Sequence, residues 1–182
     1  MTMIRNFGME RFLERMSLSN YSGNLILKGG LLIASMVGLD NRATMDIDTT
    51  IRNYNLSSED ARKMIEDIIA IPLDDGTRFE VKNVESIMDE AEYPGIRFKL
   101  EAVLDTMKTP LKIDISTDDV ITPKEVNYEY KLMFEERSIP LLAYNLETVL
   151  AEKMETMHSY QSHLTKYTCE TVIVKQPHDI LT

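Results

Sequence analysis

Two aspartates separated by one residue are the first candidates for chemistry in this chain. The stretch Met45–Ile51 alternates polar and apolar residues and contains β-branched side chains, so it predicts a strand. In a strand, Asp46 and Asp48 point to the same face with Cα atoms roughly 7 Å apart, while Ile47 points into the core. Two such carboxylates can converge on Mg²⁺, which prefers oxygen ligands and retains positions for water and phosphate.

An exposed strand face is the alternative explanation for this pair, because Asp-x-Asp alone is not specific. Like charges on one strand face repel each other, however, and Asp is depleted in strands. Asp114 has a similar setting, between Ile113 and Ile115 in the predicted strand 111–116. If the two strands are neighbours, three carboxylates meet and could hold two metal ions roughly 3.5–4 Å apart.

The tripeptide Lys28-Gly29-Gly30 is the second candidate, because it follows the apolar run Leu25–Leu27 and opens a predicted helix. Glycines let the backbone approach a phosphate closely, and a helix N-terminus attracts anions. An ordinary tight turn between a strand and a helix is the alternative. The sequence contains no G-x-x-x-x-G-K-[ST] motif, so this segment is not a Walker loop.

A succession of helices and strands must position these residues. The patterns predict helices over 4–18, 31–37 and 146–157, a helix that begins at 57–60, and strands over 25–27, 45–51, 79–84, 96–104 and 111–116. This order of elements predicts a mixed α/β fold (α+β), in which a sheet that is not wholly parallel carries helices packed on it.

Composition excludes several classes of protein. The chain has 182 residues, of which 43% are hydrophobic and 27% charged, as in ordinary globular proteins. Its single cysteine cannot form an intramolecular disulfide, which favours a cytoplasmic location. The formal net charge of −10 argues against a general basic surface for nucleic acid. No apolar run approaches the ~20 residues of a membrane span, and no signal-peptide pattern is present, so we expect no membrane association.

We expect one compact domain over residues 1–157 and an atypical tail over residues 158–182. No linker rich in Gly, Ser or Pro divides the chain upstream of the tail. From Ser159 onward the tail has no net charge, so the whole net charge of −10 lies upstream. The tail also holds the only cysteine and none of the twelve methionines, and this difference in composition marks it as distinct.

The order of these motifs resembles one superfamily of enzymes. A strand, Gly-Gly, a helix and then Asp-x-Asp on the next strand is the arrangement of the DNA polymerase β-type nucleotidyltransferases. More narrowly, the chain is similar to the AbiEii-like nucleotidyltransferase toxins of bacterial abortive-infection and toxin–antitoxin systems. The segments that carry the resemblance are Leu27–Gly30, Arg42–Asp48, Tyr93–Arg97, Lys112–Ser116 and Glu147–Lys153. The resemblance implies a polymerase β-like nucleotidyltransferase core.

The resemblance also assigns nine residues to one site. The nucleotide-binding residues would be Lys28, Gly29, Gly30, Arg42 and Thr44. The ligands of Mg²⁺ would be Asp46, Asp48 and Asp114. Asp114 would also help to activate the attacking hydroxyl, and Lys153 would neutralise charge on phosphate.

The chain departs from the family's pattern in two places. Position 31 is Leu, where a small or hydroxyl residue is common in the family. Family members also continue after the Ala-Glu-Lys helix with an Arg and a Lys-Asp-x-x-Asp type segment, which residues 159–182 lack. We therefore expect a truncated or frame-shifted member whose catalysis could be impaired.

Three functions are compatible with these observations. The first is a metal-dependent toxin that transfers a nucleoside monophosphate from an NTP to tRNA or to a protein, with a cognate antitoxin as partner. The second is an impaired remnant that binds a nucleotide or the antitoxin without turnover. The third is a small-molecule nucleotidyltransferase of the antibiotic-modifying type. An RNA acceptor would need a local basic groove, for which the candidates are Arg97, Lys99, Lys108 and Lys112.

Overall fold

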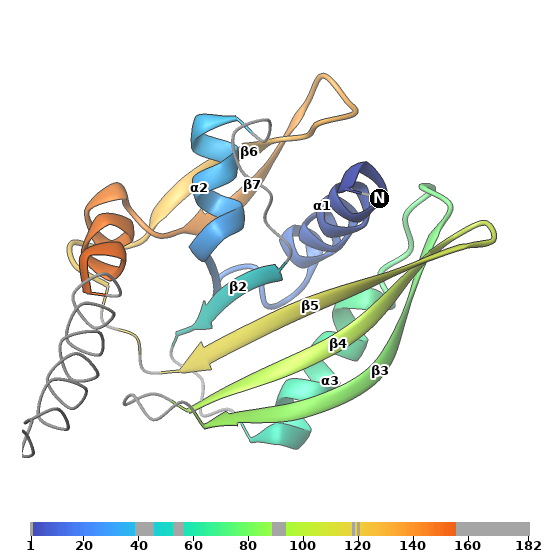
Figure 1. Ribbon diagram of the computed structural model, residues 1–182, viewed down its shortest axis with the longest axis horizontal. Coiled ribbons are helices and arrows are strands. Elements are labelled where there is room, and N and C mark those ends of the chain that lie inside the picture. The colour runs from blue at the N-terminus through green and yellow to red at the C-terminus, as the bar shows by residue number, and fades with distance from the viewer. Residues whose placement is uncertain are drawn as a thin grey trace, which may run out of the picture. The chain divides into compact units, whose positions relative to one another are not determined.

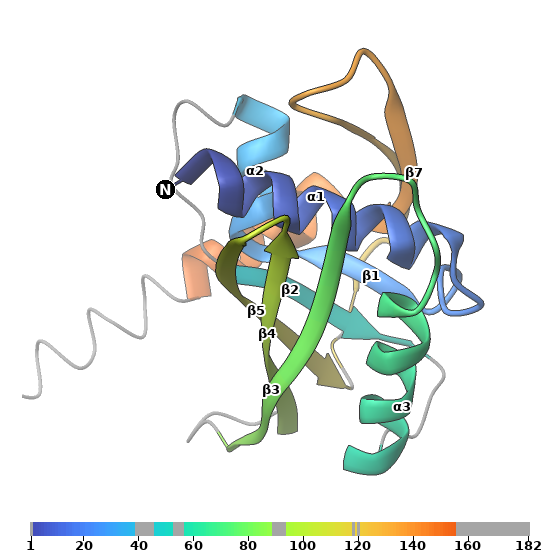
Figure 2. The ribbon, with the colours of Figure 1, turned by 90° about the vertical axis from the view of Figure 1, so that its right-hand side faces the viewer.

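The computed structural model describes residues 2–38, 46–52, 57–88, 94–117, 119 and 121–155. Its helices and strands are α1 (Thr2–Leu18), β1 (Leu25–Lys28), α2 (Gly29–Val37), β2 (Asp46–Ile51), α3 (Ser58–Ile69), β3 (Thr77–Met88), β4 (Pro94–Leu104), β5 (Met107–Thr117), β6 (Val126–Lys131) and β7 (Ser138–Ala143) (Figure 1 and Figure 2). A further helical segment covers residues 146–155. Each helix and strand that the sequence predicts is present, with bounds that differ by a few residues.

Strands β6 and β7 are additions to the sequence prediction. Tyr130 and Ile139 are buried and pair with each other across the two strands, so a weak alternating signal is present. Pro140 argues against a strand in the sequence, because proline lacks an N–H and is usually excluded from the interior of a sheet. The pairing of β7 with β1 begins only at Leu142, so Pro140 lies where β7 is paired on one side alone.

The seven strands form one mixed sheet in the order β3-β4-β5-β2-β1-β7-β6. Parallel pairs join β1 to β7 and β2 to β5, and the remaining neighbours are antiparallel. This confirms the expectation of a sheet that is not wholly parallel. It also places β2, with its two aspartates, in the middle of the sheet between β1 and β5.

Helix α1 lies across one face of the sheet, where it contacts β5 and β7, and α3 lies beside it (Figure 2). The covered face of β5 is apolar, because Leu111, Ile113 and Ile115 are buried in alternation with polar residues. Gly8 of α1 allows close packing, since a Cβ added there would lie 3.2 Å from the Cβ of Ala102. The polar residues of β5 therefore emerge on the other face of the sheet.

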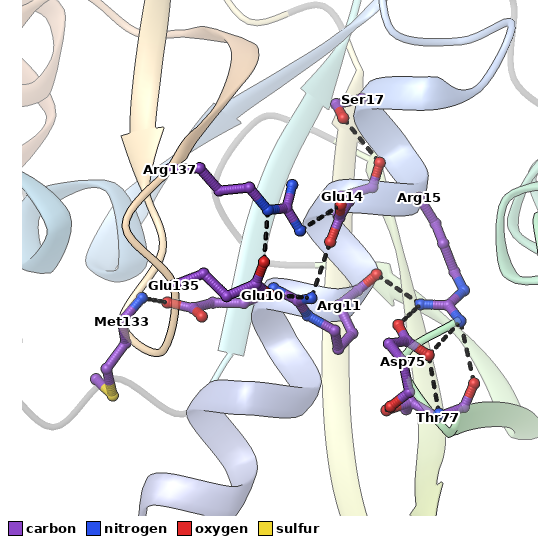
Figure 3. Close-up of polar contacts among 10 residues, drawn as sticks. All are labelled: Glu10, Arg11, Glu14, Arg15, Ser17, Asp75, Thr77, Met133, Glu135 and Arg137. Atoms are coloured by element: carbon purple, nitrogen blue, oxygen red, sulfur yellow. Dashed lines mark hydrogen bonds and ion pairs between the residues drawn. The ribbon is translucent and has the colours of Figure 1, made fainter. Parts of the chain in front are cut away.

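A group of charged residues on α1 binds two distant loops to the helix (Figure 3). The Arg15 guanidinium donates two hydrogen bonds to the Asp75 carboxylate, at 2.6 and 3.0 Å. Arg11 pairs with Glu135 at 2.7 Å, and Arg137 pairs with Glu14 at the same distance. The loop between β6 and β7 is thus fixed to α1 by charge pairs rather than by apolar packing alone.

The chain divides into two compact units, Met1–Asn145 and Leu146–Thr182. The first unit contains the whole sheet. In the second unit the described residues are the helical segment 146–155, and the expected tail over 158–182 lies outside the described residues. The expected domain boundary at residue 157 stays a prediction. No helix among the described residues is both long enough and apolar enough to cross a membrane.

Candidate active site

The aspartates of β2 lie on the polar face of the sheet. Ile47 between them is fully buried, as predicted, while Asp46 and Asp48 are partly exposed. Asp48 is directly opposite Asp114 in the parallel pairing of β2 with β5. The strand that carries Asp114 is therefore the neighbour of β2, which was the condition for bringing three carboxylates to one region.

A row of charged residues crosses four adjacent strands at this position. In strand order its members are Arg97 on β4, Asp114 on β5, Asp48 on β2 and Lys28 on β1. Opposite charges alternate along the row except at its centre, where Asp114 and Asp48 face each other. Like charges in directly opposed positions destabilise a sheet, so the centre of the row is favourable to a bound cation.

The glycines after β1 approach Asp48 closely. The Gly30 N–H donates a hydrogen bond to Asp48 Oδ2 at 3.3 Å, which places the carboxylate at the N-terminus of α2. Gly29 has φ of 69°, and a Cβ added there would lie 2.1 Å from Asp48 Oδ2. Both the backbone conformation and the space therefore require glycine at position 29. An ordinary tight turn would not require the second condition.

The electrostatic surroundings of Asp48 disfavour its negative charge. Burial raises the pKa of its carboxyl, and the nearby charges of Asp114 and Asp46 raise it further. The hydrogen bond from Gly30 and the charge of Lys28 act in the opposite direction without reversing the shift. Ionising a buried carboxyl near two other carboxylates costs free energy. Such an arrangement is characteristic of a cation site or a catalytic site.

Asp114 is engaged by a residue that the sequence analysis placed elsewhere. Arg97 Nε donates to Asp114 Oδ1 at 2.8 Å and Nη2 donates to Oδ2 at 2.6 Å, so both carboxylate oxygens are occupied. Lys112 is 3.5 Å from Asp46. Among the described residues, no three Asp, Glu, His or Cys side chains are grouped closely enough to hold a metal ion. The three aspartates share a region, but Asp114 is oriented toward Arg97.

Lys28 belongs to a second polar network. Its Nζ is 2.5 Å from Asp119 Oδ2, and it lies 5.5 Å from the centre of the Tyr144 ring. The same Asp119 oxygen accepts hydrogen bonds from Ser116 and Tyr144, each at 2.7 Å. Burial raises the pKa of Asp119, but the hydrogen bonds from Lys28 and Tyr144 outweigh this effect and lower it. The sequence reasoning missed Asp119 and Tyr144, because neither is in a recognisable motif.

The four candidates for the basic groove that an RNA acceptor would need lie on β4 and β5, and each is paired with a carboxylate. Lys99 is 2.5 Å from Glu85, and Lys108 is 3.4 Å from Glu101. Arg97 and Lys112 are paired with the site aspartates, as described above. This surface carries mixed charge rather than a positive groove, because strand pairing brings acidic residues of β2, β3 and β4 beside the basic ones.

Three of the predicted site residues cannot be placed beside the aspartates. Arg42 and Thr44 lie outside the described residues. Lys153 is exposed on the helical segment 146–155, in the second compact unit. Their roles stay predictions.

A family profile matches almost the whole sequence. The profile describes the nucleotidyl transferase AbiEii toxin of a type IV toxin–antitoxin system, and it matches residues 11–175. The chain belongs to the AbiEii family. The matched range includes the two glycines, the three aspartates and most of residues 158–182. No curated protein matches the chain.

Two solved structures have a similar fold. A protein from H. pylori, provisionally described as a nucleotidyltransferase, has a TM-score of 0.52 at 17% identity, covering 84% of this chain and 57% of its own. JHP933 from Helicobacter pylori has a TM-score of 0.50 at 17% identity, covering 84% of this chain and 55% of its own. The AbiEii chain described here thus spans little more than half the length of either protein. The likeness confirms the mixed α/β nucleotidyltransferase fold.

The donor set of this AbiEii site fits a hard divalent cation. Asp46 and Asp48 supply carboxylate oxygens from one face of β2, and Asp114 faces Asp48 from β5. Mg²⁺ is bound by such oxygens, usually from one or two carboxylates together with phosphate. The like charges of Asp48 and Asp114, directly opposite each other, give an independent reason for a cation. Asp46 and Asp48 would hold it, and Asp114 could join them on leaving Arg97.

Proposed function

We propose that this protein is a Mg²⁺-dependent nucleotidyltransferase that transfers a nucleoside monophosphate from an NTP to tRNA or to a protein. We propose further that it acts in the cytoplasm as the toxin of a toxin–antitoxin pair. The observation that supports this most strongly is the close approach of Gly29 and Gly30 to Asp48, directly opposite Asp114. A helix N-terminus, which attracts anions, is thereby adjacent to a pair of carboxylates, which attract cations, and this arrangement would suit a metal–triphosphate complex.

The proposed roles follow from the chemistry of phosphoryl transfer. The N–H groups at the start of α2 bind triphosphate oxygens, with Arg42, Thr44 and Lys153 as further contacts. Asp46 and Asp48 would hold Mg²⁺, which would supply positive charge against the phosphate oxygens. The acceptor hydroxyl oxygen forms a bond to the α-phosphorus while the bond to the bridging oxygen breaks, and pyrophosphate leaves. Asp114 accepts the proton of the attacking hydroxyl.

A second candidate is supported by the engagement of Asp114 with Arg97. In this reading the protein binds a nucleotide or an antitoxin without turnover, because the third carboxylate is not available. The small-molecule nucleotidyltransferase is a third candidate, which differs from the first only in its acceptor. The mixed charge beside the site favours no class of acceptor.

The decisive experiment is a thermal-shift panel with the four NTPs, each with and without Mg²⁺, followed by transfer assays with an α-³²P-labelled NTP. The wild type is compared with Asp46→Ala/Asp48→Ala and with Glu59→Ala/Glu66→Ala, which removes two exposed carboxylates from α3. A ligand at 100 times its Kd adds about 2.7 kcal/mol of stability. We expect an Mg²⁺-dependent shift with one NTP in the wild type and the α3 control, and no shift in the site variant.

The transfer assays use bulk tRNA, a protein lysate and a set of aminoglycosides as acceptors. Label in tRNA or protein supports the toxin activity, and label in the small molecules supports the third candidate. A shift without transfer to any acceptor supports the binding protein. The absence of both a shift and transfer contradicts the proposal.

A further inference from the structure

The guanidinium of Arg97 donates hydrogen bonds to both carboxylate oxygens of Asp114, the third aspartate of the predicted metal site. The two hydrogen bonds, at 2.8 and 2.6 Å, form a planar fork from Arg97 to Asp114. The two side chains are 34% and 20% exposed, so the pair is partly shielded from water. Charge-assisted bidentate pairs of this kind are the strongest hydrogen bonds between side chains.

The pairing of Arg97 with Asp114 is selective. Glu85 on β3 is directly opposite Arg97 and is an equally close acidic neighbour in the sheet register. Its carboxylate is instead taken by Lys99, at 2.5 Å. Asp48 also faces Asp114 and repels it. Glu85 therefore does not compete for Arg97, and Asp48 does not offer Asp114 another partner. Arg97 and Asp114 bind each other for both reasons.

This inference rests on the proposed function and concerns the assembly of its metal site. We propose that Arg97 is an internal counter-ion that holds Asp114 until a divalent cation displaces it. Asp114 thus exchanges one positive partner for another as the site assembles, and Arg97 sets the affinity of the site for metal. Arg97 is a positioning residue in this scheme.

The chemistry of arginine determines what can operate such an exchange. Arginine retains its charge at every physiological pH, so Arg97 cannot leave Asp114 by losing a proton. The competing charge has to come from a cation with a higher charge density, which the carboxylates of Asp46 and Asp48 attract first. Lys112 is a weaker competitor at Asp46, because its single contact is longer, at 3.5 Å, and its side chain is 45% exposed.

Direct titration with Mn²⁺, followed by electron paramagnetic resonance of the free ion, tests the exchange without any catalytic readout. The wild type is compared with Arg97→Gln, Arg97→Lys and the control Lys108→Gln. Lys108 lies on β5, on the same face of the sheet as Asp114, and is 3.4 Å from Glu101, which is outside the site. Both glutamine variants remove one positive charge from this face, so a change of net charge alone would affect both.

We expect Arg97→Gln to bind Mn²⁺ about tenfold more tightly than the wild type, and Lys108→Gln to change the affinity by less than about twofold. Arg97→Lys retains the charge without the fork and should be intermediate. The gain must also depend on Asp114. Adding Asp114→Asn to Arg97→Gln should return the affinity to about that of Asp114→Asn alone.

Three results would overturn the inference. They are an unchanged or weaker Mn²⁺ affinity in Arg97→Gln, an equal gain in Lys108→Gln, and a gain that survives Asp114→Asn. If Arg97→Gln does not fold, Arg97→Lys decides the outcome by the same comparison. The proposed function fails separately: it is contradicted when the wild type shows neither an NTP shift nor transfer, whatever the order of the Mn²⁺ affinities.

Discussion

The Asp48 carboxylate lies directly against Gly29, where any other residue would place its Cβ. Position 29 has a positive φ at the turn from β1 into α2, and the next N–H, that of Gly30, donates to Asp48 on β2. A side chain at this position would occupy the volume of the Asp48 carboxylate. At the scale of single residues, the site is therefore built on one backbone conformation and one missing Cβ.

Replacing Gly29 with Ala should lower the free energy of unfolding by roughly 1–3 kcal/mol. The cost arises because alanine is strained at positive φ and because its Cβ would displace Asp48. Gly23→Ala is the matched control, since a Cβ at that position would meet nothing within 4 Å. Chemical denaturation of both variants makes the comparison, and equal stability of the two would contradict this reading of the turn.

Replacing Asp48 with Asn should stabilise the metal-free protein at pH 7 by on the order of 1 kcal/mol. The folded-state pKa of Asp48 is raised above its ordinary value of 3.8, so the wild type loses stability as the pH rises through the raised pKa. The asparagine side chain carries no charge and escapes this loss, while its amide oxygen can still accept from Gly30. The advantage of Asp48→Asn should therefore disappear below about pH 4 in urea unfolding experiments. An advantage independent of pH would contradict the electrostatic explanation.

Helix α1 is bound to two segments of the chain that lie between other elements. Its charged side chains reach the loop between β6 and β7 and the turn before β3 (Figure 3). Glu10 is 1% exposed and accepts a hydrogen bond from the Met133 N–H at 2.8 Å. At the scale of elements, a buried carboxylate on one helix thus anchors a loop more than a hundred residues away in the sequence.

The Glu10→Gln variant should separate the titration of this anchor from its hydrogen bond. Burial raises the pKa of Glu10 to about 7, although Met133 and Arg11 act against the shift. The folded-state pKa exceeds the unfolded value near 4.5, so the folded protein holds the proton of Glu10 more tightly than the unfolded chain does. The contribution of this protonated carboxyl to the free energy of unfolding is complete below pH 4.5 and is lost as the pH rises through 7. Glutamine retains the acceptor for Met133 without titrating.

Between pH 5 and pH 8, the free energy of unfolding of the wild type should therefore fall relative to that of Glu10→Gln by on the order of 2 kcal/mol. Urea denaturation at several pH values measures this difference directly. Parallel pH profiles for the two proteins would show that Glu10 does not titrate in this range.

The charge of the whole molecule limits its general affinity for RNA. The net charge is −10, and the basic residues of β3, β4 and β5 near the site are paired with carboxylates. Neutral pairs release no counter-ions from RNA, so they contribute little general affinity. Recognition of an RNA acceptor would have to depend on its shape or on contacts made in the metal–nucleotide complex.

Removing the paired carboxylates should reveal a latent affinity for RNA. We expect Glu85→Gln/Glu101→Gln to bind bulk tRNA about tenfold more tightly than the wild type at low salt, because Lys99 and Lys108 lose the carboxylates with which they are paired. The control Glu59→Gln/Glu66→Gln makes the same change of net charge on α3. Filter binding at increasing salt provides the measurement, and an equal gain in the control would indicate a net-charge effect alone.

Local features of this protein were predictable from the amino-acid sequence alone. Side chains alternate strictly along a strand, so the pattern around Ile47 was enough to place Asp46 and Asp48 on one face. The order of the motifs resembles that of the AbiEii family, and this resemblance implied the nucleotidyltransferase fold. The strand pattern was sufficient for the two aspartates because the alternation of side chains depends only on neighbouring residues of the chain.

Contacts between distant residues were not predictable in this way and follow from the arrangement of the strands. Strand pairing set Asp114 opposite Asp48 and brought Arg97 from β4 onto Asp114, and it neutralised the expected basic groove. It also joined Asp119 to Lys28 across more than ninety residues of sequence. Such contacts depend on the order and register of strands, which arise from packing the whole sheet, and no local pattern specifies them.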